Sequence, residues 1–304
     1  MTYFKCSAIN PNEITITING TKIDHSVSLK KTDVVNDIEL STLPYEFKCG
    51  SAVIYNNEIH ILGGNASINT YRNHYKYDGS TWTKVSTLPY EFYYNNNALI
   101  YNDEIHILGG DTGSRNHYKY DGSTWTKVST LPYGFSRGNS IVYNNEIHIL
   151  GGSGNNNEYT KHYKYDGSTW TSVSTLPYNF HWGQVLIYNN EIHILGGVYN
   201  SIAKTNHYKY DGSTWTSVST LPYNFNAGSA VVYNNEIHIL GSDDNPDKHY
   251  KYDGSTWTEV STLPYNFHYN PAVVYNNEIH ILGSYDSNCR TNHYMIQATH
   301  YVIV

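Results

Sequence analysis

One stretch of sixteen residues is repeated along the chain almost without change. The sequence YKYDGSTWTKVSTLPY occupies residues 75–90 and again 118–133, and near-copies of it begin at Tyr163, Tyr208 and Tyr250. The shorter motifs EIHILG and LPY each occur six times, at steps of 42 to 46 residues. A fixed period of this length is typical of a repeat architecture, in which each repeat is one small unit that packs against its neighbours.

Each repeat contains four short segments that favour β-strands. In the first copy we expect strands a, b, c and d at residues 50–55, 58–62, 74–78 and 80–85, with the sequences GSAVIY, EIHIL, HYKYD and STWTKV. Asn56 and Asn57 follow strand a, and asparagine tolerates the positive φ of a tight hairpin turn. Asp78-Gly79 separates strands c and d, which is a strong hairpin signal between aromatic-rich segments. No helical periodicity interrupts this pattern.

Six sheets of this kind can bury their faces only by packing against one another. A single sheet of four short strands cannot cover both of its faces, whereas a sheet packed between two neighbours can. The sequence therefore predicts an all-β, six-bladed β-propeller with four antiparallel strands in each blade and a short N-terminal β extension. We expect the blades at about residues 41–85, 86–128, 129–173, 174–218, 219–260 and 261–304.

The repeats resemble those of the kelch family of β-propellers. In that family strand b ends in a glycine doublet, and a Tyr and a Trp follow on strands c and d. The doublets here are Gly63-Gly64, Gly109-Gly110, Gly151-Gly152 and Gly196-Gly197. The aromatic pairs are Tyr77/Trp82, Tyr120/Trp125, Tyr165/Trp170, Tyr210/Trp215 and Tyr252/Trp257. The resemblance covers about residues 41–304 and implies a kelch-type propeller, although a shared fold says little about function.

Three features depart from the family pattern. The spacing from the Tyr to the Trp is shorter than is usual in the family. The fifth and sixth repeats carry Gly241-Ser242 and Gly283-Ser284 in place of the doublet. In the sixth repeat Ile296/Tyr301 replaces the aromatic pair.

The two ends of the chain offer two ways to complete the sixth blade. Aligning His293 with His74 places Tyr301 at the position of Trp82, so we expect the C-terminal segment to form the sixth strand d. The alternative is residues 36–40, where NDIEL before Ser41 aligns with TWTKV before Ser86.

Residues 1–40 precede the repeats as an N-terminal extension. The sequence EITITINGTKI predicts a hairpin around Asn19-Gly20. If the protein is part of a larger assembly, we expect this extension to provide the attachment.

The charge of the chain argues against two classes of partner. Only 15 % of the residues are charged and the formal net charge is −7, whereas nucleic acids and anionic membranes are bound by basic surfaces. No apolar stretch approaches the length of a membrane span, and the first residues lack the basic and apolar regions of a secretory signal. We therefore expect no nucleic-acid partner, no membrane insertion, and a location that is cytoplasmic or reached by export without a signal.

The repeats differ from one another mainly on one face of the predicted ring. Because successive strands alternate in direction, the b–c loops and the d–a connections lie on one face, and the near-identical tight turns lie on the other. The start of strand a provides the predicted ligand-binding residues Lys48, Tyr93, Tyr94, Asn95, Arg137, His181, Trp182, Asn226, His268, Tyr269 and Asn270. The b–c loops add the variable residues Tyr71, Arg72, Arg115, Tyr159, Tyr199, Asp243, Asp244, Tyr285 and Arg290.

Most of the histidines occupy repeated positions. Twelve of the 16 lie in EIHIL or directly before the first Tyr of strand c, where we expect them to pack and to form hydrogen bonds. His181 and His268 share one position in the fourth and sixth repeats, and kelch-like copper oxidases use His and Tyr near the axis with a nearby Cys. No compact ligand set unites these residues, and Cys6, Cys49 and Cys289 are far apart in the sequence. We predict no metal, no cofactor and no catalytic residue.

The composition of the variable face favours recognition. Tyr, Trp and Arg beside amide side chains are typical of binding hot spots, and aromatic rings also suit the apolar faces of sugars. The strand-a segments contain no Asp or Glu that could act as a paired acid and base. We therefore predict a non-enzymatic module that binds a protein or a glycan. The alternative is an enzyme, either a sugar-ring isomerase resembling the kelch-type sialic acid mutarotases or a metal-dependent oxidase.

Overall fold

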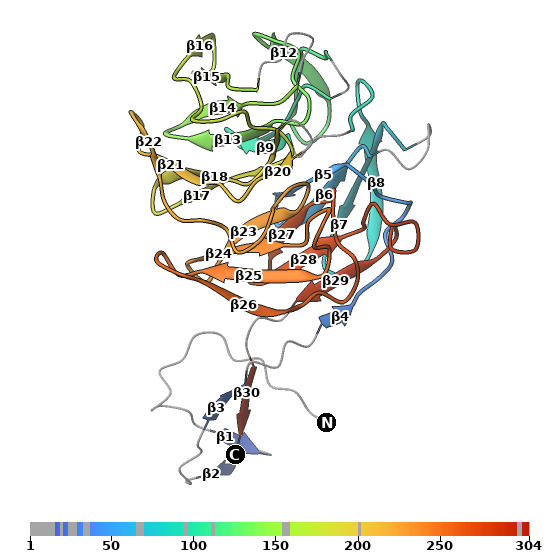
Figure 1. Cartoon of the computed structure of the whole chain (residues 1–304). Coiled ribbons are helices and arrows are strands. Elements are labelled where there is room, and N and C mark those ends of the chain that lie inside the picture. Colours follow the sequence, from blue (N-terminus) through green and yellow to red (C-terminus); the bar gives the residue numbers. More distant parts are fainter. Residues whose placement is uncertain are drawn as a thin grey trace. The chain divides into compact units, whose positions relative to one another are not determined.

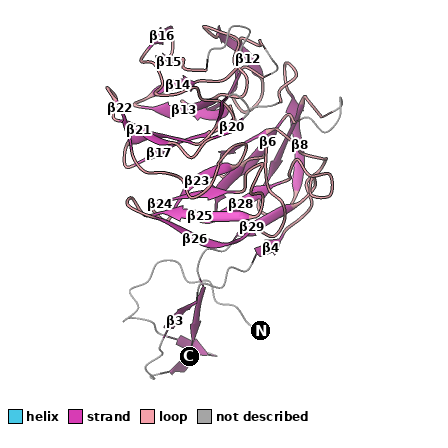
Figure 2. Ribbon diagram, in the orientation of Figure 1, coloured by secondary structure: helices cyan, strands magenta, loops and turns pink. Residues whose placement is uncertain are grey.

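Six four-stranded antiparallel sheets arranged as the blades of a propeller make up most of the computed structural model (Figure 1). The structure describes residues 16–18, 21–23, 29–32, 37–64, 70–93, 97–110, 113–153, 159–199, 202–296 and 300–303. Within these residues there are strands and loops but no helix (Figure 2). The predicted all-β, six-bladed propeller with four antiparallel strands in each blade is therefore confirmed.

The first three blades follow the repeats directly. Blade 1 contains β5 (Ser51–Tyr55), β6 (Glu58–Leu62), β7 (Asn73–Tyr77) and β8 (Trp82–Thr87). Blade 2 contains β9 (Ala98–Tyr101), β10 (Glu104–Leu108), β11 (Asn116–Tyr120) and β12 (Trp125–Thr130). Blade 3 contains β13 (Asn139–Tyr143), β14 (Glu146–Leu150), β15 (His162–Tyr165) and β16 (Trp170–Ser172).

The remaining blades contain one additional hairpin and one strand from the other end of the chain. Blade 4 contains β17 (Gln184–Tyr188), β18 (Glu191–Leu195), β21 (His207–Tyr210) and β22 (Trp215–Ser217), and its b–c loop holds the hairpin β19 (Val198–Tyr199) and β20 (Ile202–Ala203). Blade 5 contains β23 (Ser229–Tyr233), β24 (Glu236–Leu240), β25 (Lys248–Tyr252) and β26 (Trp257–Thr262). Blade 6 contains β27 (Ala272–Tyr275), β28 (Glu278–Leu282), β29 (His293–Ile296) and β4 (Asp37–Glu39).

The tight turns form for the reasons that the sequence suggests. Asn56 and Asn57 both have positive φ, 49° and 59°, which matches the two-residue turns that suit the twist of a hairpin. In the c–d turn the Asp78 carboxylate accepts hydrogen bonds from the backbone N–H groups of Ser80 and Thr81, both at 2.8 Å. These bonds close the turn between β7 and β8. Equivalent bonds close the c–d turns of blades 2 to 5.

The hydrophobic core lies between neighbouring blades. One buried cluster joins Val53 and Leu62 of blade 1 to Phe92, Ile105 and Ile107 of blade 2. The innermost strands contact one another around the ring, and β27 contacts β5 to complete the circle. A core shared between blades explains why the residues on the facing sides of the sheets remain nearly constant from repeat to repeat.

The constant LPY-x-F segment joins each blade to the preceding one. The backbone N–H groups of Leu88 and Phe92 in blade 2 donate to the carbonyls of Arg72 and Tyr71 in the b–c loop of blade 1, at 2.9 and 3.0 Å. The phenylalanine of this segment is fully buried in every blade, at Phe47, Phe92, Phe135, Phe180, Phe225 and Phe267. Hydrogen bonding and burial together fix the position of each b–c loop beside the next strand a.

The N-terminal strand β4 completes blade 6, and the expectation that the C-terminal segment does so is wrong. β4 pairs with β29, with Asp37 opposite Ile296 and Glu39 opposite Tyr294. The last strand, β30 (His300–Ile303), pairs instead with β3 (Leu29–Thr32). The physical reason lies in the turn: no Asp-Gly follows strand c in the sixth repeat, so nothing in the sequence favours a tight reversal into a strand d.

The terminal residues form a separate compact unit. Met1–Asn36 with Gln297–Val304 is one unit, and Asp37–Ile296 is the propeller. In the terminal unit β1 (Ile16–Ile18) pairs antiparallel with β2 (Thr21–Ile23) on either side of residues 19–20, which themselves lie outside the described residues.

Candidate functional site

Five residues that lie just before a strand a have an unusual backbone conformation. Cys49, Arg137, Trp182, Ala227 and Tyr269 all lie in the left-handed region, with φ between 53° and 60°. A non-glycine residue adopts this conformation at a cost in energy, and such residues are concentrated at binding and catalytic sites. Here they recur at one level of the ring, and three of them have large side chains.

Hydrogen bonds between blades hold this conformation in place. The N–H of Trp182 donates to the carbonyl of Arg137 at 2.8 Å, and the N–H of Ala227 donates to the carbonyl of Trp182 at 2.7 Å. In the same way, the N–H of Tyr269 donates to the carbonyl of Ala227. The N–H of Cys49 donates to the side-chain oxygen Oδ1 of Asn270 at 3.0 Å. Because the backbone provides these bonds, the side chains at this level can vary without loss of the ring.

The side chains at this level form a row of aromatic rings with a cation at each end. The ring centroids of Trp182 and Tyr269 are 5.0 Å apart, and those of Tyr269 and Tyr285 are also 5.0 Å apart. The Arg137 guanidinium lies 5.5 Å from the centre of the Trp182 ring. The Lys48 ammonium lies 3.8 Å from the centre of the Tyr285 ring. These residues come from blades 3, 4, 6 and 1, so the row crosses the ring.

A carboxylate from blade 5, that of Asp243, contacts Tyr269 of this row and the neighbouring His268. Asp243 Oδ1 lies 3.2 Å from Nδ1 of His268, and its Oδ2 accepts a hydrogen bond from the Tyr269 hydroxyl at 3.3 Å. Burial, with the Asp243 charge beside it, raises the pKa of Tyr269. We call the surface formed by Lys48, Arg137, Trp182, Asp243, His268, Tyr269 and Tyr285 the mouth surface.

Two further pairs join a b–c loop to the start of the next strand a. The rings of Tyr71 and Tyr93 are stacked with centroids 4.6 Å apart, and those of Tyr159 and His181 lie 4.9 Å apart. Burial, with Arg137 nearby, lowers the pKa of His181 to about 4. The two variable sets of residues that the sequence singles out therefore meet at the boundaries between blades.

Two of the predicted ligand-binding residues are buried in the structure. The side chain of Asn270 is fully buried, and its amide nitrogen donates to the carbonyls of Phe47 and Leu282 at 2.9 and 2.8 Å. Asn226 is also buried; its backbone carbonyl accepts from the N–H of Asp243, and its side-chain oxygen Oδ1 has no hydrogen-bond partner among the described residues. Tyr94 and Asn95 lie outside the described residues.

Sequence reasoning placed Asp243 and Tyr285 only among variable loop residues, not among the predicted ligand-binding residues. The b–c loops differ in length and sequence, so no repeat position identifies these two side chains. The exposure of Tyr285 is one feature that sets it apart. In the part of the chain that the structure describes, the exposed large hydrophobic side chains are Ile202 at 59 %, Tyr285 at 42 % and Ile38 at 38 %. The two most exposed both lie in b–c loops.

The opening at the axis is narrow. The cavity lined by Arg137, Trp182, Tyr269 and Cys49 has a volume of about 20 Å³, which is room for about one water molecule. A second cavity of about 150 Å³ lies along the innermost strands and is lined by Ser51, Ser140, Ser229 and neighbouring small residues. Asn139 and Gln184 line both cavities, so the two adjoin along the axis.

Across the described ranges no group of three or more His, Cys, Asp or Glu side chains could hold a metal ion. Cys49 is buried, and burial raises its pKa to about 12, so its thiol is protonated. His181 and His268 contact different b–c loops, through Tyr159 and Asp243. No helix in the described part of the chain is long and apolar enough to span a membrane.

The fold is shared with a known protein. The chain is similar to the solved structure of YjhT, with a TM-score of 0.72 and 15 % sequence identity over 86 % of this chain and 99 % of that one. At this level of sequence identity, the similarity shows a shared fold and nothing about a shared function. No protein-family model matches the sequence, and neither does any curated protein sequence.

Proposed function

We propose that this chain is a kelch-type propeller that acts as a non-enzymatic recognition module and binds a protein or a glycan through the mouth surface. The observation that carries the proposal is the aromatic row from Trp182 through Tyr269 to Tyr285, with Arg137 and Lys48 at its ends. Tyr, Trp and Arg are the residues that most often dominate binding energy at interfaces. The row is built from positions that vary between otherwise constant repeats, and packing alone does not account for this choice of residues.

The size of the axial opening favours binding over catalysis. Sites that enclose a small molecule have volumes of roughly 300–1,000 Å³, whereas the cavity at the mouth measures about 20 Å³. An enzyme acting on a free sugar would also need an acid and a base. Among the described residues of the mouth surface the one carboxylate is Asp243, which is engaged by His268 and Tyr269. A broad ligand that covers the rings from outside fits this surface better.

One pair of variants tests this function on a glycan array. Trp182→Ala combined with Tyr285→Ala should weaken retention of the bound glycans by at least about tenfold, because hot-spot side chains each contribute more than 1 kcal/mol. The melting temperature should change little, since both side chains are partly exposed. The matched control is Thr83→Ala with Thr126→Ala, at exposed positions of the outer strands, which should bind like the unaltered protein.

Three results would count against the proposal: unfolding of the mouth variant, equal loss of binding in the control, or turnover of a free sugar. A protein ligand is tested by placing a photo-reactive amino acid at position 285 or at position 83. Crosslinks that form from position 285 and not from position 83 would support recognition through the mouth surface.

We also propose that the terminal residues attach the propeller to a larger assembly. Asp37 begins strand d of blade 6 and Ile296 ends its strand c, so both lie on the face of the tight c–d turns, opposite the mouth surface. Light scattering of the full chain and of a chain lacking residues 1–36 tests this: the full chain should be larger than a monomer and the shortened chain monomeric, and equal monomeric masses would contradict the idea.

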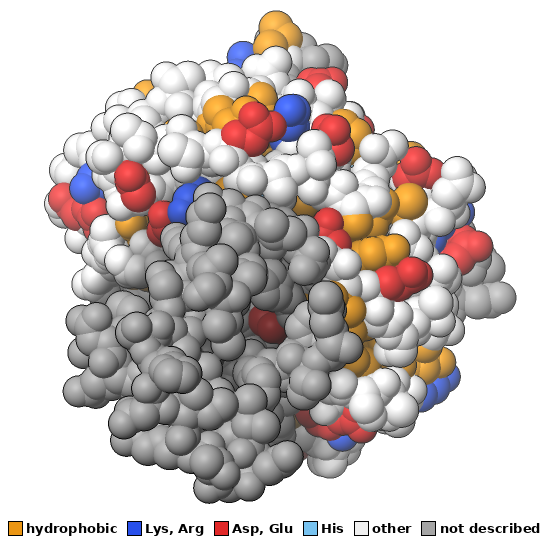
Figure 3. Space-filling view, turned by 90° about the horizontal axis from the view of Figure 1, so that it is seen from below, with side chains coloured by type: hydrophobic (Ala, Val, Ile, Leu, Met, Phe, Trp, Pro, Cys, Tyr) orange, Lys and Arg blue, Asp and Glu red, His pale blue; other side chains and the backbone are white. Residues whose placement is uncertain are grey.

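We also propose that the chain has no nucleic-acid partner. On the face drawn in Figure 3, Lys and Arg side chains are scattered among Asp and Glu, and the described residues there form no continuous basic patch. Nucleic-acid binding depends on such a patch.

A further inference from the structure

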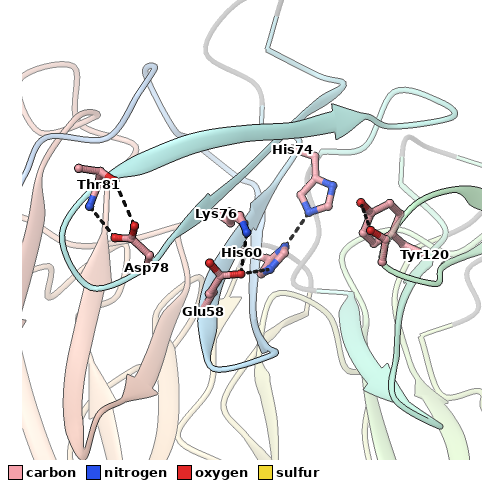
Figure 4. A network of polar contacts seen from close by, with 8 residues as sticks. Glu58, His60, His74, Lys76, Asp78, Thr81 and Tyr120 are labelled. Atoms are coloured by element: carbon pink, nitrogen blue, oxygen red, sulfur yellow. Dashed lines mark hydrogen bonds and ion pairs between the residues drawn. The ribbon is translucent and has the colours of Figure 1, made fainter.

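Each blade places two buried histidines face to face. In blade 1, Nδ1 of His60 on β6 lies 2.8 Å from Nε2 of His74 on β7 (Figure 4). The same contact, at 2.8 or 2.9 Å, joins His106/His117, His148/His162, His193/His207, His238/His249 and His280/His293. All twelve side chains are buried. We call each of these pairs a histidine dyad.

In five of the six dyads, all except His238/His249, the second histidine contacts aromatic rings of the next blade. The ring of His74 lies 5.2 Å from that of Tyr120 and 5.7 Å from that of Trp125, both in blade 2. Nδ1 of His74 also lies 2.8 Å from Oγ of Ser86, which accepts a hydrogen bond from Nε1 of Trp125 at 3.0 Å. The dyad is therefore linked directly to the indole that packs blade 2 against blade 1. Equivalent ring contacts join blades 2 to 3, 3 to 4, 4 to 5 and 6 to 1.

This geometry accommodates a neutral dyad. The hydrogen bond between the two rings uses one proton, because one facing nitrogen donates and the other accepts. A single added proton can sit on an outer ring nitrogen and leave this bond in place, but when both histidines are charged two N–H groups face each other at 2.8 Å. Protonation of both histidines of a dyad therefore requires the rings to separate.

The groups that face the dyad do not compensate a positive charge. Nε2 of His60 lies 4.0 Å from the Glu58 carboxylate, but that carboxylate is already paired with Lys76 at 2.9 Å. From the neighbouring elements the dyad meets Tyr55 of β5, Ser86 of β8, and Tyr120 and Trp125 of blade 2, none of which carries a charge. Equivalent Glu–Lys pairs are present in blades 2 to 5, and in blade 6 Met295 stands where the lysine would be, opposite His280.

We propose that the six histidine dyads make the propeller an acid-sensitive ring, in which proton uptake separates neighbouring blades along the contacts that the dyads share with tyrosine and tryptophan. Six dyads that respond in the same direction give a steep transition, because opening one contact exposes the next.

The direction of the effect follows from the two states of each histidine. Burial lowers the pKa of His60 to about 4 and that of His74 to about 3, and the other dyads behave alike. In the opened chain each histidine returns to its usual pKa of about 6.5. The opened state therefore binds more protons, so stability is complete above that value and falls as the pH decreases through it. Each dyad histidine that titrates lowers the folding equilibrium constant by up to about tenfold per pH unit.

The carboxylates of the c–d turns contribute in a separate range, whereas burial raises the pKa of Asp37 to about 6, so this one group takes up its proton in the folded state and offsets one proton of the histidine effect. Backbone hydrogen bonds from Thr81 and Ser80 lower the pKa of Asp78 to about 2, so its stabilising effect is lost only as the pH falls below the ordinary carboxyl value of 3.8. A transition between about pH 6.5 and pH 4 thus reports the histidines.

Urea unfolding at a series of pH values tests the proposal. The unfolding midpoint should fall steeply below about pH 6.5, and its slope should correspond to uptake of roughly ten protons or more on unfolding near pH 5. Tryptophan fluorescence should change in the same transition, because the indoles leave the dyads. A midpoint that stays constant down to pH 4.5, or an uptake of two protons or fewer, would overturn the proposal.

A variant without one dyad isolates its contribution. His148→Gln combined with His162→Gln should reduce the proton uptake by about two and move the acid transition to lower pH. Thr83→Ala changes an exposed residue outside the dyads and should leave both quantities unchanged. If the double variant does not fold, the ring C–H resonances of the unaltered protein decide: dyad histidines that titrate near pH 6.5 while the protein remains folded would refute the idea.

Discussion

The first glycine after each strand b is the most tightly constrained single residue of the repeat. A Cβ atom on Gly63 would overlap the carbonyl oxygen of Phe92 in the next blade, and one on Gly109 would overlap that of Phe135. Both glycines also have positive φ, 67° and 70°. The second position of the doublet is less restricted: Ser242 and Ser284 are outside the left-handed region, and their hydroxyls bond to the carbonyls of Asn224 and Asn266. This explains why only the second glycine is replaced.

Substitution of Gly109 should therefore be costly. Gly109→Ala introduces both a strained φ and an overlap with the backbone of Phe135, and we expect a loss of about 2–4 kcal/mol in the free energy of unfolding. Ser242→Gly is the comparison: it introduces no overlap and loses only the hydrogen bonds of the Ser242 hydroxyl, so it should cost about 1 kcal/mol. Urea unfolding measures both. Equal stability of the two variants would show that the contact relaxes without cost.

The sequence identified these glycines but not the role of every variable residue. Gly50, Gly138, Gly183 and Gly228 occupy the position that Asn270 holds in blade 6, and a change from glycine to asparagine has the appearance of a new recognition residue. The amide of Asn270 instead forms three hydrogen bonds to backbone at the boundary of blades 6 and 1. A difference between repeats shows that a position can vary, but only the contacts show whether the new side chain faces solvent or the backbone.

Among the structural elements, the outer strand d connects each blade to the one before it. The indole of Trp125 at the start of β12 packs on His74 and donates to Ser86. Four such bonds recur, at Trp125, Trp170, Trp215 and Trp257. In blade 6 the residue opposite Ile296 is Asp37, so the described residues at the boundary of blades 5 and 6 contain no equivalent indole.

Removing one indole should weaken one boundary. Trp125→Ala should lower the free energy of unfolding by about 2–4 kcal/mol, because a large, partly buried ring is lost along with its hydrogen bond. Ser86→Ala keeps the ring and removes its hydrogen-bond partner, so the loss should be about 1–2 kcal/mol. If thermal unfolding ranks the two variants in the opposite order, the hydrogen bond and not the packing of the ring dominates this contact.

Regular strands were predictable, and short irregular ones were not. The alternation in EIHIL and the turn residues on either side of it locate β6 to within a residue, since strands and hairpin turns have strong local preferences. The hairpin of β19 and β20 was not predicted, because strands of two residues show no periodicity. Its Val198 is held by the carbonyl of His181 and its Ile202 is the most exposed large hydrophobic side chain of the described residues, so this hairpin lies beside the proposed site.

At the scale of the whole molecule, the number of blades could be read from the sequence, but the manner of ring closure could not. Residues 36–40 and the segment ending at Val304 both align with strand d of the other repeats, so register alone leaves two solutions. The structure takes the N-terminal strand, which makes the last pairing of the ring a contact between residues more than 250 positions apart in the chain. This pairing is only three residues long, from Asp37 to Glu39.

A covalent link at this point should stabilise the entire propeller. Ile38 lies opposite Met295, so Ile38→Cys with Met295→Cys, in a chain with Cys6→Ser and Cys289→Ser, places two thiols on adjacent strands. The disulfide closes a very long loop and should add about 2–4 kcal/mol to the free energy of unfolding. The same protein in its reduced form is the control. The link acts only on states in which β4 has left blade 6, so the oxidised and reduced forms should differ most in the hydrogen exchange of β27 to β29. If exchange slows equally in all six blades, the closing strand is not the part of the ring that opens first. If the disulfide does not form, β4 does not lie beside β29 in solution.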